Sequence, residues 1–91
     1  MVFIVCFDLN FPGQKYDELV TLIKQDHRWA RLGRYAYLVE SELTAVELRD
    51  RCKTALGGND KLYVGQVSLP AAWTGMSDNV GNWIKMKLND E

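Results

Sequence analysis

The sequence predicts a mixed α/β fold of the α+β kind, in which six core elements follow the order strand, helix, strand, strand, helix, strand. Segments with the two-residue period of a strand alternate with segments that have the 3.6-residue period of a helix. The chain has 91 residues, which fits one domain, residues 1–91. We expect a core over residues 1–67, followed by a C-terminal loop and helix over residues 68–91.

The first strand and first helix are predicted at the N-terminus. Residues 2–8 read Val-Phe-Ile-Val-Cys-Phe-Asp and are apolar on both alternating faces, which is typical of a central strand covered on both sides. Asn10 to Gly13 then form a turn. From Lys15 the period changes, and one stripe carries Tyr16, Leu19, Val20 and Ile23. This stripe predicts an amphipathic helix.

Two strands are expected next, over residues 27–31 and 34–40. In the second of them aromatic and β-branched residues alternate with the others, as in a half-buried strand. Leu32 and Gly33 lie between the two segments, and we expect Gly33 to supply the turn.

The second helix has the clearest local signal in the chain. Thr44 is followed three residues later by Glu47, the pattern of a reciprocal capping box, which stabilises a helix by about 1 kcal/mol. We expect this helix to end at Gly57-Gly58 with a left-handed cap. Its predicted buried residues are Ala45, Leu48, Cys52 and Ala55.

A last strand is predicted from Lys61 to Val67, and Pro70 ends that pattern. Ser77 or Asp78 can then cap a final helix. Its apolar stripe contains Val80, Trp83, Ile84 and Leu88. The sequence leaves open whether this helix covers its own sheet or that of a neighbouring chain.

This order of elements is that of a ferredoxin-like βαββαβ sandwich with an additional C-terminal helix. Right-handed crossovers place both main helices on one face of such a sheet. The other face is left uncovered, although the first strand is apolar on that side as well. A second copy of the chain is the simplest cover, so we expect a homodimer.

Composition restricts the classes of function. The chain has 11 basic and 12 acidic side chains, so no global positive field attracts nucleic acid, and a nucleic-acid site must be a local patch. The N-terminus lacks the features of a signal peptide or membrane span, which predicts a cytoplasmic protein without membrane contact. Cys6 and Cys52, with only one histidine, form no zinc spacing or redox pair, and we interpret both as small buried apolar residues.

Several segments, in their order along the chain, resemble one known family. They are Cys6-Phe7-Asp8, a basic hairpin leading into Tyr37-Leu38-Val39-Glu40, then Glu42-Leu43-Thr44-Ala45-Val46-Glu47-Leu48, and Asn59-Asp60-Lys61-Leu62-Tyr63-Val64. Residues 1–67 resemble the Cas-two superfamily, which contains the non-integrase subunit of the CRISPR adaptation complex and the toxin-like virulence-associated protein D. The tail from Ala71 to Gly75, with Ser77, Asp78 and Trp83, is similar to small bacterial and phage proteins catalogued as SinR-family.

The resemblance implies a ferredoxin-like homodimer whose two sheets face one another. It also implies an acidic residue at the end of the first strand, near the interface, and here that residue is Asp8. The CRISPR subunit has a further C-terminal strand that pairs with its partner's sheet. This chain has Pro70 and a predicted helix there, so the docking of an integrase partner does not carry over.

Asp8 is the one candidate for catalysis and for metal binding. Two Asp8 carboxylates across a dimer axis could hold Mg²⁺, which takes hard oxygen ligands and activates water for attack on a phosphodiester. The alternative is structural: Asp8 ends a strand and accepts hydrogen bonds from the backbone of the loop over residues 9–13.

The segment from His27 to Tyr37 is the best candidate for a nucleic-acid site, because it contains three arginines and three large aromatic residues but no acid. Arginine grips phosphates and aromatic rings stack on bases. The candidate residues are Arg28, Trp29, Arg31, Arg34, Tyr35 and Tyr37. The alternative is a structural hairpin with aromatic residues in the core and arginines paired with Glu40 and Glu42.

Three functions follow from these candidates. The first is a homodimeric scaffold or adaptor that binds RNA, DNA or a protein partner without catalysis and belongs to a phage or mobile element. The second is an enzyme, a Mg²⁺-dependent endoribonuclease of the toxin-like kind that uses paired Asp8 residues. The third is a protein-interaction or inhibitor module that binds no nucleic acid.

Overall fold

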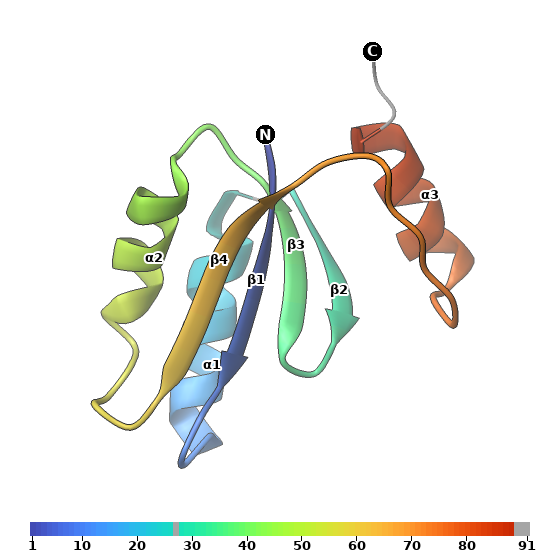
Figure 1. The fold of residues 1–91 in the computed structure, drawn as a ribbon. Coiled ribbons are helices and arrows are strands. Elements are labelled where there is room, and N and C mark those ends of the chain that lie inside the picture. The colour runs from blue at the N-terminus through green and yellow to red at the C-terminus, as the bar shows by residue number, and fades with distance from the viewer. Residues whose placement is uncertain (27, 89–91) are drawn as a thin grey trace.

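The computed structural model describes residues 1–26 and 28–88, which form a mixed α+β fold (Figure 1). A four-stranded antiparallel sheet has the order β2-β3-β1-β4, so β1 and β3 are central and β2 and β4 are the edges. The strands are β1 (Val2–Asp8), β2 (Trp29–Gly33), β3 (Ala36–Glu40) and β4 (Lys61–Val67).

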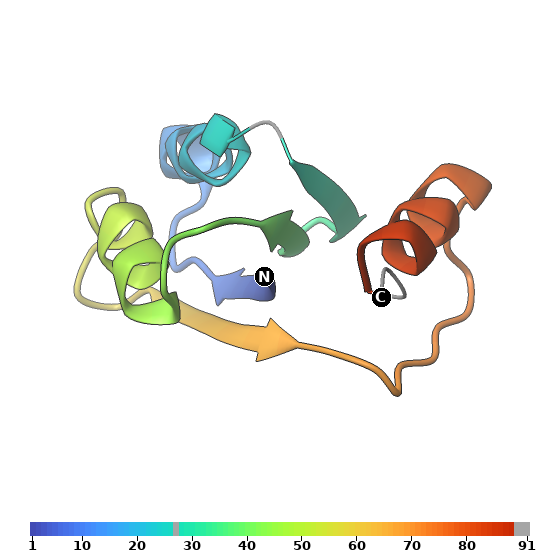
Figure 2. The same cartoon turned by 90° about the horizontal axis from the view of Figure 1, so that it is seen from above.

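Three α-helices of the described chain cover this sheet: α1 (Gly13–Ile23), α2 (Ala45–Lys53) and α3 (Asp78–Leu88). A short 3-10 helix, η1 (Lys24–Asp26), extends α1. Figure 2 shows α1 and α2 together on one side of the sheet, whereas α3 lies beyond β2. We call the face under α1 and α2 the inner face and the opposite one the outer face.

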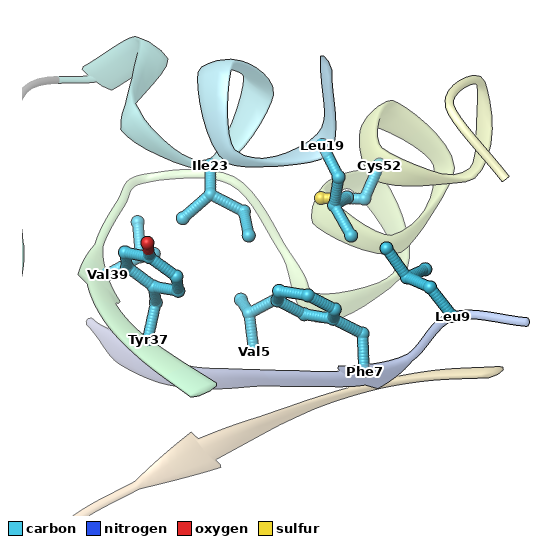
Figure 3. Packing of buried hydrophobic residues seen from close by; sticks show 8 residues of the cluster. All are labelled: Val5, Phe7, Leu9, Leu19, Ile23, Tyr37, Val39 and Cys52. Carbon is cyan, nitrogen blue, oxygen red and sulfur yellow. The ribbon is translucent and has the colours of Figure 1, made fainter. Parts of the chain in front are cut away.

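The main core lies between the inner face and the two helices (Figure 3). Alternate residues of β1 and β3 point into it, as expected for strands. Leu19 of α1 is fully buried, and Cys52 of α2 is 1% exposed. Burial raises the pKa of the Cys52 thiol to about 11, which keeps it protonated and inert. The buried residues are Val5, Phe7, Leu9, Leu19, Ile23, Tyr37, Val39 and Cys52.

A second, smaller apolar cluster lies on the outer face and is formed with α3. Ile84 packs with Val2, Ala30 and Leu38 of the same chain. A salt bridge of 2.9 Å between the Lys87 amine and the Glu40 carboxylate ties the end of α3 to β3. Within the described residues, α3 therefore covers part of its own sheet, and the outer face is not wholly open.

Neither of the two turns that we expected at glycines is formed as predicted. Gly33 belongs to β2, and the hairpin turns at Arg34 and Tyr35 instead. This turn keeps Tyr37 in register for the inner face and leaves the Tyr35 ring free to pack edge-on against Phe7, with 5.8 Å between the ring centroids.

The end of α2 also differs from the prediction. The helix ends at Lys53 with Thr54 in right-handed geometry, and neither Gly57 nor Gly58 has a positive φ. The Gly57 N–H donates to the Asp60 carboxylate (2.7 Å), so a side chain rather than a left-handed cap orders this loop. The capping box at the helix start is confirmed, because Thr44 and Glu47 exchange hydrogen bonds of 2.9 and 3.1 Å.

The described helices are also informative about membranes. None of them has both the length and the apolar character needed to cross a bilayer.

Candidate nucleic-acid interface

The structure distributes the six predicted nucleic-acid-binding residues over four places. Trp29 pairs with Val39 and Arg31 pairs with Tyr37 across the two strands. The Tyr37 ring is 2% exposed and belongs to the core, so it offers no surface for stacking. Burial, together with the neighbouring Tyr16 hydroxyl, raises the pKa of Tyr37 to about 12.

Arg28 lies at the start of β2, away from the hairpin turn. It lines a hollow of about 280 Å³ together with Glu40, Glu42 and Arg51. A hydrogen bond from Lys87 lowers the pKa of Glu40, and the positive charge of Arg28 acts in the same direction. Arg28 therefore has the acidic surroundings that a structural hairpin predicts.

Arg34 and Tyr35 form an exposed cationic and aromatic cluster at the hairpin turn. The Arg34 guanidinium lies 5.5 Å from the ring centroids of both Tyr16 and Tyr35. The Tyr16 and Tyr35 rings pack edge-on at 6.1 Å, and the Tyr35 side chain remains 40% exposed. The sequence predicted Tyr16 only as part of the buried stripe of its helix. It did not indicate the contact of Tyr16 with Arg34 and Tyr35.

Arg31 is exposed on β2, and its Nε donates to the Gly33 carbonyl oxygen over 3.3 Å. Within residues 1–26 and 28–88, neither Arg31 nor Arg34 forms an ion pair with a carboxylate. Their guanidinium groups therefore keep donors available for a phosphate. His27, at the start of the predicted segment, lies outside the described residues.

Trp29 is half-buried at the edge strand and has a lysine over its ring. The Lys24 amine lies 4.2 Å from the ring centroid, a cation–π contact that adds a positive charge next to β2. A hollow of about 250 Å³ joins Trp29 and Arg31 to Asn79, Val80 and Trp83 of α3. The sequence did not link these residues, because the side of the sheet on which α3 packs has no local signal.

Asp8 is exposed at the end of β1, opposite Lys61 of β4. In the part of the chain that the structure describes, no group of three or more His, Cys, Asp or Glu side chains is placed to hold a metal ion. Asp8 therefore contributes one carboxylate per chain. Among the described residues, the Asp8 carboxylate accepts no hydrogen bond from the backbone of the loop over residues 9–13, and a different acid has that role.

That acid is Asp60, which the sequence did not single out as a site residue. Its carboxylate is fully covered and accepts from the Asn10 N–H (2.8 Å), the Gly57 N–H (2.7 Å) and the Lys15 amine (2.7 Å). These three bonds join the loop after β1, the start of α1 and the loop before β4. Asp60 thereby fixes the backbone that follows Asp8.

Replacing Asp60 with Asn should make folding stability less dependent on acid. The hydrogen bond from Lys15, with those from Gly57 and Asn10, lowers the pKa of Asp60 to about 2, against an ordinary value of about 4 in the unfolded chain. The stabilisation is therefore complete above about pH 4 and is lost as the pH falls toward 2. Urea midpoints of wild type and Asp60→Asn should differ at pH 7 and converge in this window.

Asp17→Asn, a change at an exposed acid on α1, is the control and should follow wild type at every pH. A gap between Asp60→Asn and wild type that stays constant from pH 7 to pH 2.5 would contradict the role of the carboxylate charge.

Comparison with known proteins did not place the chain in a family. No model of a known protein family matches the sequence, and no curated protein matches it either.

Proposed function

We propose that the chain is a homodimeric, Cas-two-like scaffold that binds nucleic acid and does not cleave it. The observation that carries this proposal is the exposed pair Arg31 and Arg34, which lie beside aromatic rings and have no carboxylate partner among the described residues. Phosphates are gripped by such guanidinium groups, and exposed rings accept bases. The positive patch is local, in agreement with a net charge of −1.

The strand order supports the ferredoxin-like part of the proposal. Counted from the β4 edge the order is 4-1-3-2, and β1 and β2 both run antiparallel to the β3 strand between them. This is the arrangement of two interleaved βαβ units. Both crossover helices, α1 and α2, lie on the inner face (Figure 2).

The outer face supports the dimer. Ala36, Cys6 and Tyr63 form one row across β3, β1 and β4. The Tyr63 side chain is 63% exposed, and the apolar cluster under α3 contains none of these three residues. An exposed aromatic residue on an uncovered sheet face is typical of an interaction surface, and a second copy is the self-complementary partner.

One observation favours a second candidate, the Mg²⁺-dependent ribonuclease. Asp8 follows Cys6 on the outer face of β1 and is exposed, so a two-fold axis through this face could bring two Asp8 carboxylates together. Cleavage of RNA that requires Mg²⁺ and disappears in Asp8→Ala would establish this enzyme and overturn the non-catalytic proposal.

Removing either exposed arginine should weaken nucleic-acid binding. We expect Arg31→Ala and Arg34→Ala each to reduce the affinity for a fluorescently labelled mixed-sequence RNA about 5-fold or more at low salt. Each should also reduce the slope of log affinity against log salt concentration by about 1, the value expected for the loss of one phosphate contact. Fluorescence anisotropy over a range of salt concentrations measures both quantities.

Arg49→Ala is the matched control, because Arg49 is exposed on α2 and paired with Asp50 at 2.9 Å, away from the hairpin. Equal losses in all three variants would indicate a general charge effect and count against the site. If wild type binds a protein partner and charge reversal at Arg28, Arg31 and Arg34 leaves that binding unchanged, the interaction-module function is favoured.

A further inference from the structure

A groove lies between the free edge of β2 and helix α3, and no function has so far been given to it. It has a volume of about 250 Å³ and combines residues that are about 50 positions apart in the sequence. Figure 2 shows α3 beside the edge of the sheet formed by β2. The lining residues are Trp29, Ala30, Arg31, Asn79, Val80 and Trp83.

Two contacts hold α3, which forms one side of the groove, against the sheet. Ile84 is 4% exposed and packs with Ala30 of β2 and Leu38 of β3, which fixes the separation of helix and strand. The salt bridge between Lys87 and Glu40 holds the C-terminal end of α3. Asn79 and Trp83 are four residues apart, so they lie one above the other on the same side of the helix.

The chemistry of the lining fits a flat ring that carries polar edges. Trp83 provides an indole surface, Asn79 provides an amide that both donates and accepts, and Arg31 provides a guanidinium group. Among the described residues, no carboxylate lines the groove. Its volume is below the range of about 300–1,000 Å³ for sites that hold drug-sized molecules, and suits one ring system.

The positive charge continues from this groove around the edge of β2. Trp29 also borders a second hollow, of about 570 Å³, formed with Thr21, Leu22, Lys24 and Gln25. The amine of Lys24 lies over the Trp29 ring, and Arg31 lies two residues along the strand. A nucleic-acid backbone crossing this edge would therefore meet a cation on each side of Trp29.

We propose that the β2–α3 groove binds an unpaired base of single-stranded nucleic acid, stacked on Trp83 and hydrogen-bonded by Asn79, with the adjoining phosphate at Arg31. This proposal rests on the proposed nucleic-acid binding and deepens it by naming the substrate class. In a duplex the bases are stacked on one another and their pairing edges are occupied, so a duplex cannot enter the groove. The proposed site therefore binds single-stranded nucleic acid in preference to a duplex.

The test compares a labelled single-stranded ten-nucleotide RNA with a hairpin of the same composition. Wild type should bind the single strand at least 10-fold more tightly than the hairpin. Trp83→Leu keeps an apolar contact for α3 and removes the stacking surface, and we expect a loss of about 5- to 100-fold for the single strand. Asn79→Ala, at an exposed position, should cost several-fold and leave the hairpin affinity unchanged.

Trp73→Leu is the matched control, because Trp73 packs against the same outer cluster as Trp83 but does not line the groove. Its affinity should stay within 2-fold of wild type, and circular dichroism should show all variants folded. Quenching of tryptophan fluorescence by the single strand should be smaller in Trp83→Leu than in Trp73→Leu.

The remaining outcomes separate this proposal from the one on which it rests. If Arg31→Ala and Arg34→Ala weaken binding while Trp83→Leu and Asn79→Ala do not, the groove assignment is wrong and the nucleic-acid scaffold stands. If wild type binds neither RNA at low salt, both proposals fail. Displacement of α3 contacts by an extended peptide, with no effect of RNA, would instead identify β2 as an edge for strand addition.

Discussion

Tyr63→Glu should convert the proposed dimer into monomers. The Tyr63 ring is 63% exposed on the edge strand β4, on the part of the outer face that α3 does not cover. It also lies along its own strand over Gly65, where a Cβ atom would come within 2.6 Å of the ring. Glycine at this position thus lets the ring lie against the sheet as a fixed, flat surface.

The size of the effect follows from the large exposed ring that this residue brings to the proposed interface. Aromatic anchors of this kind cost about 2–4 kcal/mol when removed, and an unpaired carboxylate adds the cost of burying a charge. We therefore expect the dissociation constant to rise about 100-fold or more, as measured by light scattering over a dilution series. Thr21→Glu, at an exposed residue of α1 on the other side of the sheet, is the control and should dimerise as wild type does. Persistence of the dimer in Tyr63→Glu would place the interface elsewhere.

Leu19→Ala should lower the free energy of unfolding by about 3–5 kcal/mol, the largest effect on stability that we expect. Leu19 of α1 is 0% exposed and packs among Cys52 of α2 and the core residues of the inner face (Figure 3). Truncation to alanine therefore leaves a cavity that few neighbours can fill. Total stabilities of small domains are about 5–15 kcal/mol, so this loss is a large share of the total.

Urea denaturation at one fixed protein concentration measures this loss, since dimerisation makes stability depend on concentration. Val46→Ala is the control, because Val46 is exposed on α2 and should change stability by less than about 0.5 kcal/mol. A loss below about 1 kcal/mol in Leu19→Ala would mean that α1 does not pack on the sheet as described.

Features with a local signal could be predicted from the sequence. The apolar run over residues 2–8 and the segment from Lys61 to Val67 predicted β1 and β4 with their observed bounds. The capping box of Thr44 and Glu47 predicted the start of α2, and the apolar stripe with Ile84 predicted α3. In each of these cases neighbouring residues determine the structure.

Features that depend on distant contacts could not be predicted. Asp60 acts through residues 45 and 50 positions away, so its own segment indicated only a turn. The sequence left open whether the Tyr37 ring lies on the surface or in the core, and its pairing with Val5 of β1 places it in the core. The link between Arg31 and Trp83 exists only because Ile84 packs against Ala30.

The most direct test of the proposed scaffold is light scattering of the purified protein, alone and with a single-stranded RNA in the presence of Mg²⁺. We predict the mass of two chains for the protein alone, a larger complex with RNA at low salt, and RNA recovered at full length. A monomer, the absence of any complex, or RNA cut in a Mg²⁺-dependent manner that Asp8→Ala abolishes would contradict the account.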